Sequence, residues 1–268
     1  PKKRYTLLIG KDRIDPGLVV LDGQGVFHAD EALAYTPETF ASALAAIGRA
    51  AKGRKVRIVL CEELVYVTEL LLPAGTELSR ELVRQEAEAS IPEDLQATDW
   101  DFQSVRYASK SGSDGRIAVQ VAVIRADFSR LFHAALSESS LHAESIVPES
   151  YAFATLVPSL GELSVVAAMD GSGAVLVAIR DGFVVASETE VALESGDIEA
   201  FIAFSERRTG MPVARLVCSG IDPAIVSRPS EVLSLDPLIG AAMETRISGD
   251  DASVLNLAIR QAKRGIFR

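Results

Sequence analysis

The sequence predicts an α/β protein with two similar halves and an α+β block inserted between them. Three observations support this class. The 268 residues are 48% hydrophobic and 24% charged, which is typical of a globular chain long enough to bury more than one core. A pattern of three strands, a helix and a strand occurs twice along the chain. The stretch between the two occurrences has a different order of elements.

The first pattern covers residues 1–73. We expect turns at 15–17 and 22–25, where proline and glycine interrupt the apolar runs. Thr36 is typical of a helix N-cap followed by proline at the first helical position, and this helix should end near Gly53. The strands of the pattern are Tyr5–Ile9, Leu18–Leu21, Val26–Leu33 and Val56–Leu60, and Val65–Leu72 follows as a further strand.

The inserted block covers residues 74–143. Ser79 should cap a helix that ends before Ile91, and Asp127 should cap a second helix at the end of the block. Between them, two strands are joined by a polar loop at 108–115, a composition typical of a β-hairpin. These strands are Asp101–Tyr107 and Arg116–Ile124.

The second pattern begins at Leu163. It predicts a helix over Asp197–Arg208 and four strands: Leu163–Met169, Ala174–Arg180, Phe183–Val191 and Arg215–Cys218. A duplication of this size concerns the whole fold, and it indicates two stacked ribonuclease-H-like halves. We expect one half to comprise 1–73 and 144–160 and the other 161–259, followed by a basic tail over 260–268.

Charge and cysteine content narrow the possible functions. The net charge of −10 argues against a general nucleic-acid binder, which needs a basic face. Cys61 and Cys218 each follow an apolar run, so both are expected to be buried, reduced thiols. No acidic residue follows Val254, and the tail carries Arg260, Lys263, Arg264 and Arg268. This tail is either a solvated end or the cytoplasmic flank of a membrane segment.

The sequence contains no recognisable set of catalytic residues. The three histidines, His28, His133 and His142, lack the spacing of metal ligands and are expected to be structural. Asp99 and Asp101 would share a face of an extended chain, where a solvated pair is favoured over acid/base catalysis. Gly171-Ser172-Gly173 lies between two strands and therefore predicts a turn rather than a nucleophile elbow.

Several stretches, in order along most of the chain, carry a family resemblance. They are Leu70–Pro73, Leu82–Pro92, Thr98–Gln103, Ser145–Ala154 and Arg215–Gly220. With the strand repeat around Asp170–Gly182, they make the chain resemble the actin-like superfamily. Within that superfamily it is most similar to bacterial assembly-platform proteins of the PilM type and to the cytoplasmic domain of the type II secretion protein GspL.

The resemblance implies a candidate nucleotide site that departs from the pattern of ATP-binding members. Asp170 and Gly171 would lie in the second phosphate hairpin, and Gly220 would lie on the adenosine side. The first hairpin, residues 9–15, lacks the Asp-x-Gly motif of those members. We therefore expect no cofactor; in the alternative, Asp170, Gly171 and Gly220 surround ATP with magnesium.

The implied function is a non-enzymatic platform on the cytoplasmic side of the bacterial inner membrane, in type II secretion or type IV pilus assembly. Its expected partners are the assembly ATPase, inner-membrane platform proteins and a second copy of the chain, with no nucleic acid. Candidate partner-binding residues are Glu81 and Glu88 on the acidic helix, and Asn256 and Leu257 near the tail. The alternatives are an ATP-binding PilM-like protein and, less favoured, an actin-like kinase.

Overall fold

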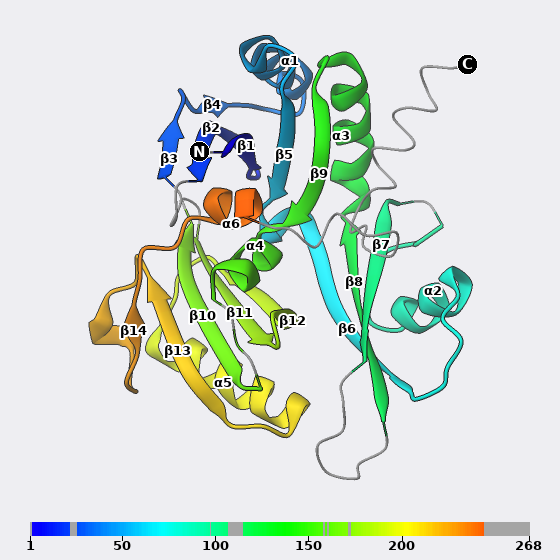
Figure 1. The fold of residues 1–268 in the computed structure, drawn as a ribbon, viewed down its shortest axis with the longest axis vertical. Coiled ribbons are helices and arrows are strands. Elements are labelled where there is room, and N and C mark those ends of the chain that lie inside the picture. The colour runs from blue at the N-terminus through cyan, green and yellow to red at the C-terminus, as the bar shows by residue number, and fades with distance from the viewer. Residues whose placement is uncertain are drawn as a thin grey trace.

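The computed structural model describes residues 2–21, 26–96, 98–106, 115–157, 159, 161–170 and 173–243 (Figure 1). Its strands form three sheets, two of which repeat one topology while the third belongs to the inserted block. Figure 1 shows the first sheet in the upper part of the molecule, the second at the lower left and the third at the lower right.

The first sheet has the strand order β3–β2–β1–β5–β9, with β4 also paired to β2. β1 is antiparallel to β2 and parallel to β5, which is in turn parallel to β9. Helices α1 (Phe40–Ala51) and α3 (Ala126–Glu138) pack on one face, where Phe40 and Phe132 are fully buried. The strands are β1 (Lys2–Ile9), β2 (Arg13–Leu21), β3 (Val26–Ala29), β4 (Leu33–Ala34), β5 (Lys55–Leu60) and β9 (His142–Pro148).

The second sheet repeats this arrangement in the order β12–β11–β10–β13–β14. β10 is antiparallel to β11 and parallel to β13, as β1 is to β2 and β5. Helix α5 (Ser195–Thr209) packs on one face and ends at Gly210, which has a left-handed backbone. The strands are β10 (Leu163–Asp170), β11 (Gly173–Arg180), β12 (Phe183–Glu190), β13 (Val213–Ser219) and β14 (Glu231–Val232). The predicted duplication is confirmed at the level of strand pairing.

The third sheet has the order β6–β8–β7, with β6 (Val65–Pro73), β7 (Trp100–Arg106) and β8 (Arg116–Ile124). Helix α2 (Arg80–Glu88) begins as expected at Ser79, whose hydroxyl accepts a hydrogen bond from the backbone N–H of Leu82 at 3.1 Å. We expected residues 65–72 to complete the first half. Instead β6 pairs with β8 along its whole length, and its Leu70 and Leu72 lie in the core of the inserted block, while Val65 lies in the core of the first half.

Three local expectations are wrong. The turn at 15–17 is absent, since β2 runs continuously through Pro16. Pro16 falls between the stretches of β2 that pair with β3 and with β4, so its missing N–H is not needed in the ladder. Helix α1 begins at Phe40 because Thr36 and Thr39 form a turn instead of a cap. Asp127 lies inside α3 and accepts from the next backbone N–H, so it is not the N-cap.

Two helices lie between the first and second sheets, in the middle of Figure 1. Helix α4 (Glu149–Leu156) follows β9 of the first sheet but packs its aromatic residues on the inner face of the second sheet. Helix α6 (Pro237–Met243) follows β14 of the second sheet but packs on the inner face of the first. The halves thus exchange their last helices, an arrangement that the sequence did not indicate.

Candidate functional site

The candidate nucleotide site begins at the turn between β1 and β2, residues 10–12. The backbone N–H of Gly10 donates to the carbonyl of Arg13 at 2.8 Å, so it is already used within the turn. The buried Tyr35 holds the turn from behind: its hydroxyl donates to the Gly10 carbonyl and its N–H to the Asp12 carbonyl. Burial raises the pKa of Tyr35, which therefore stays a hydrogen-bond donor. Two hydrogen bonds from Tyr35 thus anchor this turn to the first half.

The corresponding edge of the second half lies at the ends of β10 and β13. Asp170 pairs with Gly173 across the hairpin, while Gly171, Ser172 and the Asp170 side chain lie outside the described residues. Gly220 follows β13 with φ of 69°, and a Cβ there would lie 3.3 Å from the Cβ of Met169. The structure therefore brings Gly220 and the β10 end to one sheet edge, as the alternative requires. The side chain of Met169 is 47% exposed at this edge. The surface of the edge is therefore partly apolar.

Acidic residues lie on elements next to this edge: Glu190 of β12 pairs with Ala174 of β11, and Asp236 follows Leu235, whose N–H donates to the Ser219 hydroxyl at 3.0 Å. Burial raises the pKa of Glu188, and the neighbouring charges of Glu190 and Asp197 raise it further. From the other side, Asp236 caps α6 through the backbone N–H of Leu238 at 2.8 Å. Burial, and also the charge of Asp15 on β2, raise the pKa of Asp236. Clustered negative charge disfavours a triphosphate, which binds where backbone amides and cations converge.

The exchanged helices join the two halves tightly. At their crossing, a Cβ on Gly240 of α6 would lie only 2.2 Å from the carbonyl oxygen of Ala152 in α4. Two arginines of the first sheet hold the other end of α6. Arg57, buried between strands, donates to the carbonyl of Ala241 at 2.7 Å, and Arg4 donates to the carbonyl of Ala242. Cations at a helix C-terminus also complement its dipole.

The inserted block is attached to the second half as well as to the first. The Glu69 carboxylate on β6 is 1% exposed and pairs with Arg180 of β11 at 3.3 Å. Arg208 of α5 donates to the Glu69 carbonyl at 2.6 Å. Gln120 of β8 donates to the carbonyl of Val184 in β12. Because α3 of the block also packs on α1, the block bridges both halves.

A buried carboxylate lies where the three parts meet. Glu62 belongs to a short 3-10 helix, η1 (Glu62–Leu64), between β5 and β6. Its Oε2 accepts from the backbone N–H of Ser150 at 3.1 Å, so it caps the beginning of α4. Burial raises the pKa of Glu62, and hydrogen bonds from Ser187 and Ser150 offset only part of that effect. A capping role for Glu62 was not visible in the sequence.

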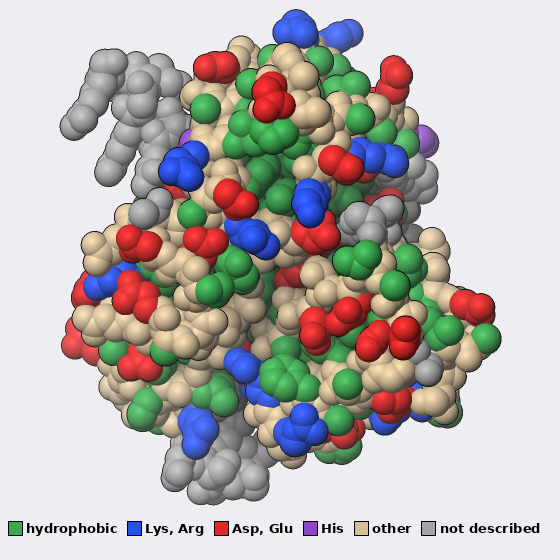
Figure 2. Space-filling model, turned by 180° about the vertical axis from the view of Figure 1, so that it is seen from behind, with side chains coloured by type: hydrophobic (Ala, Val, Ile, Leu, Met, Phe, Trp, Pro, Cys, Tyr) green, Lys and Arg blue, Asp and Glu red, His purple; other side chains and the backbone are tan. Residues whose placement is uncertain are grey.

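The predicted partner-binding residues have different outcomes. Glu81 and Glu88 lie on the exposed face of α2, where both pair with Arg84 at 2.5 Å. The single positive charge of Arg84 therefore balances one of the two negative charges of Glu81 and Glu88. Asn256, Leu257 and the basic residues of the tail lie outside the described residues. On the face in Figure 2, acidic side chains gather beside hydrophobic ones at the lower right, over the second sheet.

Asp99 and Asp101 are both buried, so the expected solvated pair is wrong. Asp99 accepts hydrogen bonds from Ser129 and His133 of α3, and Arg80 of α2 pairs with Asp101 at 3.5 Å. Burial alone would raise the pKa of Asp99, but the bonds from His133 and Ser129 lower it overall. Since Ser129 and His133 share the same carboxylate oxygen instead of contacting each other, the group fastens α3 to the third sheet.

Other expectations concern metals, thiols and membranes. Cys61 and Cys218 are free and buried, as predicted. Among the residues that the structure describes, no three His, Cys, Asp or Glu side chains are grouped to hold a metal ion. Within those same ranges, no helix combines the length and the apolar character required to cross a bilayer.

Comparison with known proteins confirms the fold. No family model and no curated protein sequence matches the chain. The solved PilM–PilN type IV pilus biogenesis complex contains a chain with a TM-score of 0.62 and 14% identity, with 98% of each chain covered. The cytoplasmic domain of EpsL, an inner-membrane component of the type II secretion system of Vibrio cholerae, has a TM-score of 0.61 and 15% identity, covering 94% of this chain and all of that one. The chain has the actin-like α/β fold that the sequence predicted.

Proposed function

We propose that the chain is a non-enzymatic platform domain of a type II secretion or type IV pilus assembly complex. The observation that carries the proposal is the likeness, over nearly the full length of both chains, to a PilM chain and to the EpsL cytoplasmic domain. The first of these belongs to a type IV pilus biogenesis complex, and the second is part of an inner-membrane component of a type II secretion system. On this proposal the domain lies on the cytoplasmic side of the inner membrane, next to membrane components, with its basic tail facing anionic lipid.

The internal construction supports a platform. The exchanged helices, the bridging insert and the buried Glu69–Arg180 pair join all three parts into one unit. A unit joined in this way suits a protein that transmits force or position between partners. We propose that it recruits the assembly ATPase and couples it to the membrane components, with no nucleotide chemistry of its own.

An ATP-binding, PilM-like function is the second candidate. It is favoured by Gly220, whose left-handed backbone lies beside the β10 end, and by Lys11, which is exposed in the first turn. Against it are the turn tied by Tyr35 and the carboxylates around the second edge. Asp170, Gly171 and Gly220 would hold the nucleotide in this case, with magnesium.

The ATPase partnership can be tested on α2. The double variant Glu81→Lys, Glu88→Lys should weaken a pull-down of the purified assembly ATPase from the same genome, because the partner would face reversed charge. The effect should be largest at low salt and shrink as salt screens it. The matched control is Glu138→Lys with Glu162→Lys, an equal charge change on exposed residues outside α2. Equal binding by both double variants and the wild type would remove α2 from the interface.

A further inference from the structure

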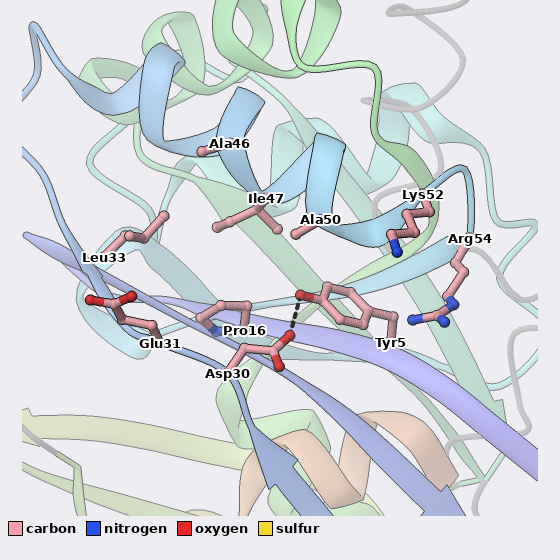
Figure 3. Close-up of a pocket in the computed structure, with 10 residues that line it drawn as sticks. All are labelled: Tyr5, Pro16, Asp30, Glu31, Leu33, Ala46, Ile47, Ala50, Lys52 and Arg54. Carbon is pink, nitrogen blue, oxygen red and sulfur yellow. Dashed lines mark hydrogen bonds between the residues drawn. The ribbon is translucent and has the colours of Figure 1, made fainter.

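An open groove of about 490 Å³ lies on the first half, between α1 and the segment that joins β3 to β4 (Figure 3). Tyr5 of β1 and Pro16 of β2 form its floor. The walls are apolar in the middle and charged at the two ends. Its remaining lining residues are Asp30, Glu31, Leu33, Ala46, Ile47, Ala50, Lys52 and Arg54. The volume is within the range of ligand-binding sites.

The charges at the two ends are opposite in sign. Figure 3 shows Lys52 and Arg54 together at one end and Glu31 at the other, with Asp30 between them beside Tyr5. Within the described part of the chain, neither the Lys52 ammonium nor the Arg54 guanidinium makes a hydrogen bond or ion pair, and the same holds for the Glu31 carboxylate. Asp30 accepts from the Tyr5 hydroxyl at 2.6 Å, which fixes the floor. A ligand that matches the groove therefore carries charge of both signs.

The wall opposite α1 offers backbone groups as well. The N–H of Asp30 donates to the carbonyl of Pro16 at 2.9 Å, but the backbone groups of Glu31 and Ala32 make no hydrogen bond to any residue that the structure describes. β3, which immediately precedes these residues, is an edge strand of the first sheet. An extended peptide satisfies such groups by main-chain hydrogen bonds, whereas a small apolar ligand does not.

We propose that this groove binds an extended peptide segment of a partner protein. An acidic side chain of the segment pairs with Lys52 and Arg54, an apolar side chain packs on Ile47 and Leu33, and a basic side chain faces Glu31. The main chain of the segment forms hydrogen bonds with the backbone groups of Glu31 and Ala32. The lining of the groove includes no residue of the β1–β2 turn and none of the β10–β13 edge, so the proposal does not depend on the nucleotide argument.

Peptide selection tests the proposal without a known partner. A phage-displayed library of random peptides of about 12 residues is selected on the full chain, and the best binders are measured by fluorescence anisotropy. We expect enriched peptides in which an apolar residue separates an acidic from a basic one. The double variant Lys52→Glu, Arg54→Glu should weaken their binding about tenfold or more, since charge-assisted hydrogen bonds are lost. Ala46→Phe, which narrows the groove and keeps its charges, should weaken it similarly.

The matched control is Arg49→Glu, a charge reversal on the exposed surface of α1 outside the groove, which should leave binding unchanged. Thermal melting of each variant verifies folding. The proposal is overturned if no peptide is enriched, or if enriched peptides bind the groove variants as well as the wild type. It is also overturned if binding requires deletion of residues 244–268, because the occupant is then the chain's own tail. A wild-type dimer that Ala46→Phe dissociates would assign the groove to a second copy.

Discussion

The two halves share strand order and pairing but differ where an actin-like site would form. In the first half, the hairpin turn is tied back by the buried Tyr35. In the second, the equivalent edge leaves Met169 exposed and keeps Gly220 in a left-handed conformation. Alternating apolar residues are enough to repeat a core, whereas a binding site needs particular residues in its turns. The repeated core therefore does not by itself define a binding site.

The contacts that join the three parts of the molecule are also of two different kinds. The exchanged helices, which approach closely at Gly240 and Ala152, connect the first half to the second, and a buried ion pair connects the insert to the second half. The following variants separate the contributions of these two joints.

Arg180→Ala should have the largest effect. It leaves the Glu69 carboxylate buried without this partner, and removing one member of a buried pair costs about 3–5 kcal/mol of unfolding free energy. The measurement is urea unfolding followed by circular dichroism. The control is Arg215→Ala, which breaks the exposed pair with Glu231 and should cost under about 1 kcal/mol. Similar losses for the two variants would mean that the insert is not held by buried charge.

Gly240→Ala should have the next largest effect. Its new Cβ meets the Ala152 carbonyl oxygen, so α6 must move away from α4, at a cost of about 1–3 kcal/mol. Gly196→Ala, in α5 with nothing within 4 Å of the new Cβ, should be neutral or slightly stabilising. Urea unfolding compares the two. If Gly240→Ala is as stable as Gly196→Ala, the helix exchange is not a tight joint.

Glu62→Gln should have a smaller, pH-dependent effect. Because burial raises the pKa of Glu62 in the folded state, the folded chain holds this proton more firmly than the unfolded one. The stability of the wild type should therefore fall as pH rises from the ordinary glutamate pKa through the raised one. The glutamine variant, which can still accept from Ser150, should avoid this loss and melt higher than the wild type at pH 7 but not at pH 4. Glu86→Gln, on an exposed position of α2, should show no such divergence.

The contacts that join the parts of the molecule are also the features that the sequence did not predict. The strand repeat, the Ser79 cap and the end of α5 at Gly210 follow from local periodicity and capping, and the structure has all of them. The role of α6 could not be predicted, because its seven residues are all apolar or small and do not indicate which sheet they cover. Likewise Glu62, Glu69 and Asp99 are polar residues in ordinary contexts, and only tertiary contacts bury them.

The central claim is that this actin-like fold serves as a platform without nucleotide, and a thermal melt with ATP and magnesium tests it most directly. A ligand at 100 times its dissociation constant stabilises by about 2.7 kcal/mol, which for a chain of this size raises Tm by roughly 5 °C or more. We predict no change in Tm at millimolar ATP with magnesium, and the same Tm for Asp170→Ala in either condition. A rise of that size that Asp170→Ala abolishes would contradict the claim and establish the ATP-binding alternative.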